Sequence, residues 1–260
     1  MLAELWAAVQ SDWQILALSS AAIFLAAIVR GFSGFGFSLL SITAIALILP
    51  VKQIVPSIFL LEIAASINML PGIWREIHWR SLVWLMVGYV IGLPFGVYAL
   101  AHAPEAPAQI VLGIFVIGTA IMMLRGFRLE KTPAPAASTA TGAVSGLLNG
   151  AFGIGGPPAV LFYFSTPGAA AIGRASIIFF FLFTDLVGVC YLAIQGLVTM
   201  QSFVQAALWL PTLLVGVWIG AHGFRRMNEQ VFRRWVLVIL IALALLGIGK
   251  AVLTLSTGAP

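Results

Sequence analysis

Two short glycine-rich stretches interrupt apolar sequence at matching places in the two halves of the chain. They read RGFSGFGFSLL from Arg30 to Leu40 and NGAFGIGGPPA from Asn149 to Ala159. The hydrocarbon core of a membrane offers no water to backbone amides, so a helix broken at that depth is tolerated only where it lines a cavity enclosed by protein. Broken helices in both halves of a membrane chain are typical of a transporter's substrate site.

A helix that starts after such a break presents free backbone N–H groups and the positive end of its dipole, and both favour an anion. We therefore expect the two motifs to meet near the membrane midplane and to bind an anionic group. The alternative is that the glycines only allow close packing of helices. The candidate binding residues are Arg30, Gly31, Ser33, Gly34, Gly36, Ser38, Asn149, Gly150, Gly153, Gly155 and Gly156.

Arg30 is the candidate charged ligand, because it directly precedes the first glycine motif. A guanidinium group binds planar or tetrahedral oxyanions with two parallel hydrogen bonds. The alternative is that Arg30 extends along the end of the first span to reach the membrane interface.

Two carboxylates lie within apolar sequence, Glu62 in SIFLLEIAAS and Asp185 in FFLFTDLVGV. They are 123 positions apart, close to the 119 positions that separate Gly31 from Gly150, so they are predicted to be equivalent residues of a repeat. An ionisable side chain inside a span is costly and suggests function, here a proton acceptor or cation ligand that couples transport. Structural alternatives are a hydrogen bond to the backbone of a broken helix, or an ion pair with Arg30 or Arg174.

Other chemistries find no support in the residue pattern. His78, His102 and His222 lack metal-ligand spacing, and Cys190 has no partner cysteine. Neither motif is a dinucleotide fingerprint, because Leu39 and Pro158 stand where its third glycine belongs. We therefore expect no metal, no cofactor, no catalytic residue and no enzyme activity. The short loops also leave no room for a nucleic-acid-binding platform.

The elements that must position these residues are membrane helices. The chain is 62% hydrophobic and 8% charged, with a mean hydropathy of +1.10, which predicts an all-α polytopic membrane protein. Apolar runs lie at 13–30, 33–50, 54–72, 80–101, 108–125, 139–152, 154–166, 174–196, 202–222 and 231–255. We interpret residues 1–125 as a first transmembrane repeat, 126–138 as a cytoplasmic linker, and 139–260 as a second repeat, with broken or re-entrant helices at the glycine motifs.

The basic residues predict that the two repeats of five apolar segments are inverted. Basic residues are enriched in cytoplasmic loops. With both termini outside, ten of the thirteen basic residues fall on the cytoplasmic side, whereas Lys52 and Lys250 fall outside and Arg30 lies at the motif. The ten are Arg75, Arg80, Arg125, Arg128, Lys131, Arg174, Arg225, Arg226, Arg233 and Arg234. Equivalent loops of the two halves thus carry opposite charge patterns. The expected location is the cytoplasmic membrane.

The stretches GFSGFGFSLL and NGAFGIGGPPAVLFYF resemble the paired motifs of the TauE/SafE family of membrane anion transporters, and the likeness covers nearly the whole chain. The resemblance implies movement of sulfite, thiosulfate, sulfoacetate and related sulfonates across the cytoplasmic membrane, outward in the sulfite-exporting members. It also places the glycines of 31–36 and 150–156 along the substrate path. The first motif has Phe37 and Ser38 where the second has Gly156 and Pro157, so the two halves of the path are not expected to be identical.

The resulting hypothesis is a secondary transporter of small anions that works by alternating access around a midplane site. Its predicted partners are a small anionic substrate, a coupling proton or cation, and the lipid bilayer. Two alternatives stay open at this point: a passive anion channel with a continuous wet pore, and a membrane scaffold without transport.

Overall fold

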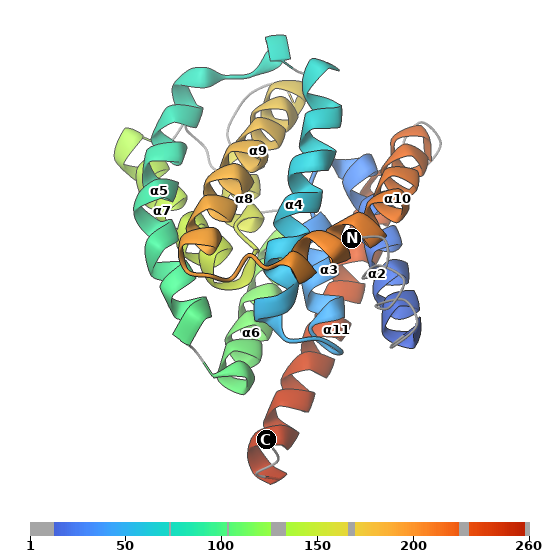
Figure 1. Ribbon diagram of the computed structural model, residues 1–260. Helices are drawn as coiled ribbons and strands as arrows, with labels where there is room; N and C mark the ends of the chain where they lie inside the picture. The colour runs from blue at the N-terminus through green and yellow to red at the C-terminus, as the bar shows by residue number, and fades with distance from the viewer. Residues whose placement is uncertain are drawn as a thin grey trace.

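The computed structural model describes residues 13–72, 74–102, 104–125, 134–165, 170–223 and 229–257, and within these ranges it contains helices and no strand (Figure 1). This confirms the prediction of an all-α protein. The helices are α2 (Trp13–Ser33), α3 (Phe37–Ile45), α4 (Val51–Met69), α5 (Trp79–His102), α6 (Glu105–Leu124), α7 (Pro135–Phe152), α8 (Gly156–Ser165), α9 (Ala170–Ile194), α10 (Met200–Gly223) and α11 (Glu229–Thr257), with short 3-10 turns η1 (Leu70–Gly72) and η2 (Trp74–Glu76).

Helix length separates spanning helices from half-helices. Among the described residues, α2, α4, α5, α9 and α10 are long and apolar enough to cross a membrane, and α6 and α11 contain shorter apolar stretches. The helices that follow the two glycine motifs are much shorter, with 9 residues in α3 and 10 in α8. At 1.5 Å per residue they cover about half of a hydrocarbon core of about 30 Å. Each motif therefore joins a long helix to a half-helix.

The two halves of the chain interlock by exchanging helix partners. Helix α2, the first described helix of the first half, packs against α10, while its counterpart α7 packs against α5. Two further pairs of counterparts pack against each other, α4 against α9 and α6 against α11. This exchange gives the contacts an approximate twofold symmetry, as expected for a duplicated chain.

Helices α4 and α9 run in opposite directions, as inverted repeats require. Phe59 in the middle of α4 contacts Gly188 in the second half of α9. His78, which lies beyond the end of α4, donates its backbone N–H to the hydroxyl of Ser176, near the start of α9, over 3.0 Å. In Figure 1, α4 rises toward the top of the molecule and α9 descends from it.

Glycines bring α5 and α7 into direct backbone contact. Gly88, Gly92 and Gly96 recur every four residues on α5, and Gly142, Gly146 and Gly150 do the same on α7. A Cβ atom added at any of them would collide with backbone atoms of the facing helix. Gly31 meets α10 in the same way, at Val217. Close packing, the alternative interpretation of the motif glycines, is thus the structural role of Gly31 and Gly150.

The described basic residues near the helix ends separate into two groups. Arg75 and Arg80 lie between the end of α4 and the first turn of α5. At the opposite end, Lys52 donates to the carbonyl of Ala101 over 2.9 Å and Lys250 donates to that of Leu47 over 2.9 Å. Helix α7 begins at Pro135, inside the predicted linker, because proline fits the first turn of a helix. Outside the described residues lie Arg128, Lys131, Arg225 and Arg226, as do the side chains of Ser33, Arg174, Arg233 and Arg234.

Candidate functional site: a cavity between two broken helices

The two helix breaks begin in the same way, although Gly36 of the first break has a second positive φ, of 90°, that the second break lacks. Gly34 follows α2 and Gly153 follows α7, each with a positive φ, of 81° and 68° respectively. The Gly34 N–H donates to the Arg30 carbonyl and the Gly153 N–H to the Asn149 carbonyl, both over 2.7 Å. A left-handed residue that closes the last turn is a common way to end a helix, and glycine adopts it without a Cβ penalty. The chain then turns and begins a half-helix.

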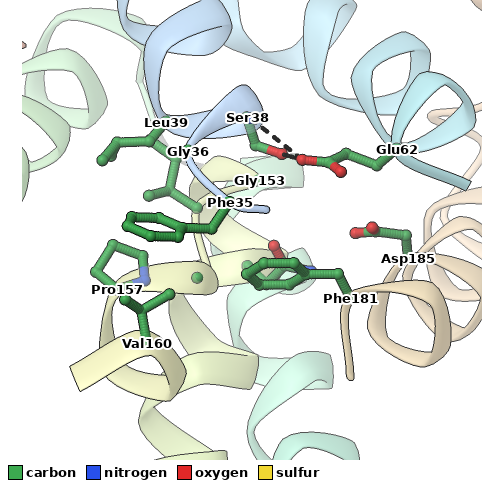
Figure 2. A pocket seen from close by; sticks show the side chains of 13 residues that line it. Phe35, Gly36, Ser38, Leu39, Glu62, Gly153, Pro157, Val160, Phe181 and Asp185 are labelled. Atoms are coloured by element: carbon green, nitrogen blue, oxygen red, sulfur yellow. Dashed lines mark hydrogen bonds between the residues drawn. The ribbon is translucent and has the colours of Figure 1, made fainter. Parts of the chain in front are cut away.

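A cavity lies where the two half-helices begin (Figure 2). Four elements contribute most of its wall: the start of α3, the start of α8, and the middles of α4 and α9. The positive ends of α3 and α8 therefore both border the cavity. Its lining residues are Phe35, Gly36, Ser38, Leu39, Glu62, Asn149, Gly153, Ile154, Gly156, Pro157, Val160, Phe181 and Asp185.

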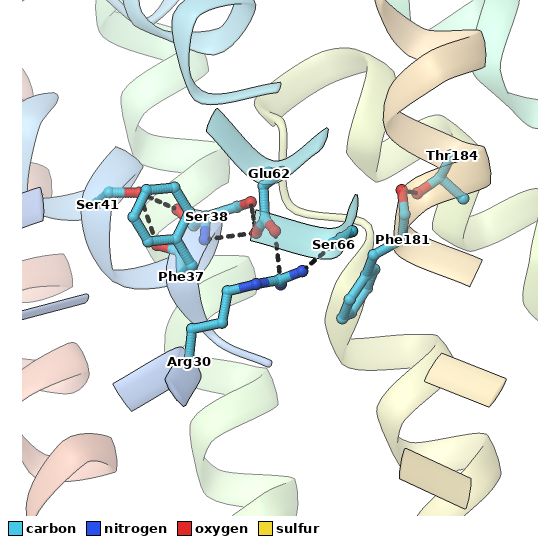
Figure 3. Close-up of polar contacts among 8 residues, drawn as sticks. All are labelled: Arg30, Phe37, Ser38, Ser41, Glu62, Ser66, Phe181 and Thr184. Carbon is cyan, nitrogen blue, oxygen red and sulfur yellow. Dashed lines mark hydrogen bonds and ion pairs between the residues drawn. The ribbon is translucent and has the colours of Figure 1, made fainter. Parts of the chain in front are cut away.

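Arg30 and Glu62 form a buried ion pair beside this cavity (Figure 3). The guanidinium NH1 lies 2.5 Å from Glu62 Oε2, and NH2 donates to the Ser66 hydroxyl over 2.7 Å. Ser38 completes the carboxylate's contacts, because its hydroxyl and backbone N–H donate to Oε1 over 2.6 and 3.2 Å. Arg30 is 0% exposed, so it does not extend to the membrane interface. The ion pair also realises one of the structural alternatives for Glu62.

Arg30 lies behind the cavity wall. It does not line the cavity, but Glu62 and Phe181, which do, both contact it. The Phe181 ring centroid is 5.6 Å from the guanidinium carbon, within the range of a cation–π contact. Figure 3 shows the guanidinium between the Glu62 carboxylate and this ring. The Phe181 ring therefore lies between the cavity and the Arg30 guanidinium. In this conformation an anion in the cavity would interact with the guanidinium only at a distance, without direct contact.

On the other side of the cavity, Asn149 forms hydrogen bonds that connect the second break to α5. Its Oδ1 accepts the Gly155 N–H over 2.9 Å, and its Nδ2 donates to the Tyr89 hydroxyl over 2.8 Å. That hydroxyl donates in turn to the Thr184 carbonyl over 2.6 Å. One amide side chain thus connects the start of α8 with α5 and with the α9 turn that carries Asp185.

Asp185 has fewer contacts than Glu62. Its side chain is buried and lines the cavity, and its Oδ2 has no hydrogen-bond partner among the described residues. It lies near enough to Glu62, Arg30 and Asn149 to interact with them electrostatically. In Figure 2 its carboxyl group points from α9 toward the space beside Glu62.

The backbone amides of the motifs are less available than the sequence predicts. The N–H groups of Gly34, Gly153 and Gly155 already donate to acceptors within the chain. Helix α8 adds few donors at its start, because Pro157 and Pro158 have no N–H. A ring of free amides is therefore not what the two breaks present to the cavity, and the nearby positive groups are Arg30, which is paired with Glu62, and the two helix ends.

The predicted site residues fall into two sets, apart from Ser33, whose side chain lies outside the described residues. Those in the cavity wall are Gly36, Ser38, Glu62, Asn149, Gly153, Gly156 and Asp185, while Arg30, Gly31, Gly34, Gly150 and Gly155 do not line it. Apolar residues that the sequence did not predict complete the lining, namely Phe35, Leu39, Ile154, Pro157, Val160 and Phe181. A usable signal was present for Phe35 and Ile154, since each lies directly after the left-handed glycine of its motif. In the described part of the chain, no group of three or more His, Cys, Asp or Glu residues is arranged to hold a metal ion.

Comparison with known proteins assigns this architecture to a family. A relative in Cupriavidus necator, described as a probable sulfite/organosulfonate exporter TauE, is 27% identical over 225 residues, which cover 83% of this chain and 85% of the relative. No solved structure matches the chain. The family described as sulfite exporter TauE/SafE matches residues 19–246, a range that includes both glycine motifs, both carboxylates and Arg30. The chain therefore belongs to the sulfite exporter TauE/SafE family.

Proposed function

We propose that this chain exports small sulfur-containing or organic anions, such as sulfite, thiosulfate and sulfonates, across the cytoplasmic membrane. Family membership and the relative named as a sulfite/organosulfonate exporter support the substrate class and the outward direction. The protein then acts as a carrier, and no catalytic step on the anion is part of the proposal.

The observation that carries the proposal is the position of the cavity. It lies between the N-terminal ends of two half-helices, one from each half of the chain, with the Arg30 guanidinium directly behind its wall. Helix N-termini and a buried cation attract negative charge, and the surrounding apolar side chains limit competing water. Gly36, Ser38, Asn149, Gly153 and Gly156 supply the neutral part of the wall, and Glu62 and Asp185 supply its carboxylates. Arg30 supplies the positive charge from behind the wall, as the partner of Glu62.

The same arrangement supports alternating access as the proposed mechanism. Antiparallel halves that meet at one site can rock against each other, so that the cavity opens first to one side and then to the other. The contact between α4 and α9 is the natural place for this movement, because each helix carries one of the two carboxylates, Glu62 and Asp185. Both termini face outward in this proposal, as the distribution of basic residues predicts.

Counterflow in proteoliposomes tests the carrier mechanism. Vesicles loaded with unlabelled sulfite should accumulate labelled sulfite transiently, and the rate should saturate with concentration. A passive channel would give non-saturating flux without counterflow. Thermal unfolding tests binding itself, because an anion that binds the native protein raises its melting temperature. A scaffold without transport would show no stabilisation by sulfite, thiosulfate, sulfonates or carboxylates.

A further inference from the structure

The two halves of the site differ at equivalent positions. Arg30 precedes Gly31 as Asn149 precedes Gly150, and the Gly34 and Gly153 amides close the two helices on those two residues. Ser38 and Pro157 are 119 positions apart, the same spacing as Arg30 and Asn149, and Glu62 corresponds to Asp185. Each carboxylate therefore belongs to a half-site with its own neighbours, and these neighbours are different.

The first half-site pairs its carboxylate with a cation. Glu62 receives one cation, Arg30, and two hydrogen bonds from Ser38. In the second half-site, Asn149 replaces the arginine and is neutral, while Pro157 replaces the serine and has neither an N–H nor a hydroxyl. Asp185 Oδ2 is accordingly buried without a hydrogen-bond partner in the described part of the chain.

The groups that face Asp185 come from several helices. Glu62 faces it from α4, Tyr89 from α5, the neutral Asn149 from α7 and Arg30 from α2. The α8 residues at the cavity, Gly156, Pro157 and Val160, are not titratable. Arg75 and Glu76 of η2 are exposed and lie near the start of α9, where Trp74 contacts Phe179. The Arg30 charge is already matched by Glu62, so an ionised Asp185 gives the site one net negative charge.

Resting on the anion transport proposed above, we infer that Asp185 is the proton-binding residue of this transporter and that its proton travels in the same direction as the anion. A proton from the aqueous side to which the cavity is open adds to Oδ2, and it leaves to water on the opposite side together with the anion. Glu62 keeps its charge throughout, because the ion pair with Arg30 and the two hydrogen bonds from Ser38 stabilise the ionised carboxylate.

The shared direction follows from charge and linkage. An ionised Asp185 repels an anion in the cavity, whereas a protonated Asp185 is neutral and offers an O–H donor. At the distances within one cavity this difference favours anion binding by about tenfold to a hundredfold. Linkage is reciprocal, so the anion favours the proton by the same factor. Ligands that favour each other's binding are carried together, and a monovalent anion with one proton crosses the membrane without net charge.

Proton uptake on anion binding tests this inference with the purified full-length protein. Isothermal titration with methanesulfonate and with sulfite, in buffers of different ionisation enthalpy, gives the number of protons taken up per anion bound. The comparison is between wild type and Asp185→Asn, and the difference between them cancels any proton exchange of the anion itself. Glu76→Gln is the matched control, because it removes an exposed carboxylate near the start of the same helix.

The expected result is uptake of up to one proton in wild type and Glu76→Gln, and none attributable to the protein in Asp185→Asn. Wild-type affinity for methanesulfonate, whose charge is constant with pH, should then rise by up to tenfold for each unit that the pH falls. This pH series stands even if Asp185→Asn does not fold. Anion binding with equal proton uptake in all three proteins, or with a flat wild-type pH series, overturns the inference but not the transport function. Binding of neither anion overturns both.

Discussion

The Arg30 guanidinium and the Glu62 carboxylate lie 2.5 Å apart with both side chains buried, and they join the end of α2 to the middle of α4. Removing one partner of such a pair leaves an uncompensated charge in the interior, which costs about 3–5 kcal/mol. Arg30→Gln and Glu62→Gln should therefore each lower the melting temperature in detergent. The melting temperature of the double variant should fall by less than the sum of the two single decreases, because no unpaired charge then remains buried. Additive losses would show that the pair does not act as a unit.

Gly153 ends α7 with a φ of 68°, and a Cβ atom there would lie 2.5 Å from Cδ1 of Ile42 on α3. Gly153→Leu should therefore displace the start of α8 and abolish transport, and Gly34→Leu should do the same at the first break, where φ is 81°. Phe95→Leu on α5 is the control, since that side chain is 67% exposed and is expected to face lipid. Uptake of labelled sulfite, normalised to protein in the membrane, is the measurement. Normal uptake by both glycine variants would show that transport does not require the helix breaks at Gly34 and Gly153.

Gly92 allows the backbone of α5 to touch that of α7 at Ala143. A leucine there must push the helices apart, at a cost of about 1–3 kcal/mol or more. Gly92→Leu should lower the melting temperature, whereas Gly118→Leu on α6, where nothing lies within 4 Å of an added Cβ, should leave it nearly unchanged. Equal effects of the two substitutions would argue against tight α5–α7 packing.

Phe181 separates Arg30 from the cavity, since it lines the cavity and also contacts the guanidinium. Phe181→Ala should open a path to Arg30 Nε, which has no hydrogen-bond partner among the described residues, and should strengthen anion binding. One additional charge-assisted hydrogen bond corresponds to about a tenfold lower Kd. Titration calorimetry with sulfite measures this effect, with Phe203→Ala on α10 as an exposed aromatic control. An unchanged or higher Kd would mean that the ring does not shield Arg30.

The positions of the helix breaks and of the paired carboxylates were predictable from the sequence, because glycine spacing and buried charge leave strong signals. The roles of individual glycines were not. Gly31 and Gly34 are both motif glycines, but Gly31 packs against α10, whereas Gly34 ends α2 with a positive φ. That distinction depends on backbone geometry and on the neighbouring helix.

The orientation of long and aromatic side chains was also out of reach. Arg30 finds Glu62 only because α2 and α4 are held at a particular distance and rotation, which no local pattern records. Phe179, Phe180 and Phe181 are equally hydrophobic, and the rotation of α9 alone decides that Phe181 lines the cavity. No pattern in the sequence shows that Asp185 Oδ2 lacks a hydrogen-bond partner within the described part of the chain, because this depends on how its neighbours are placed.

Protection of a cavity residue by an anion tests directly whether the anion binds in the cavity between the two helix breaks. Val160→Cys places a thiol in the cavity wall, and Gln195→Cys places one at an exposed position between α9 and α10. Both are made in a Cys190→Ser background, because Cys190 is the one cysteine of the chain. Methanesulfonate should slow the reaction of Val160→Cys with a small water-soluble thiol reagent and leave that of Gln195→Cys unchanged. Equal rates with and without methanesulfonate in the Val160→Cys protein, at concentrations that raise its melting temperature, would place the anion elsewhere and contradict the account.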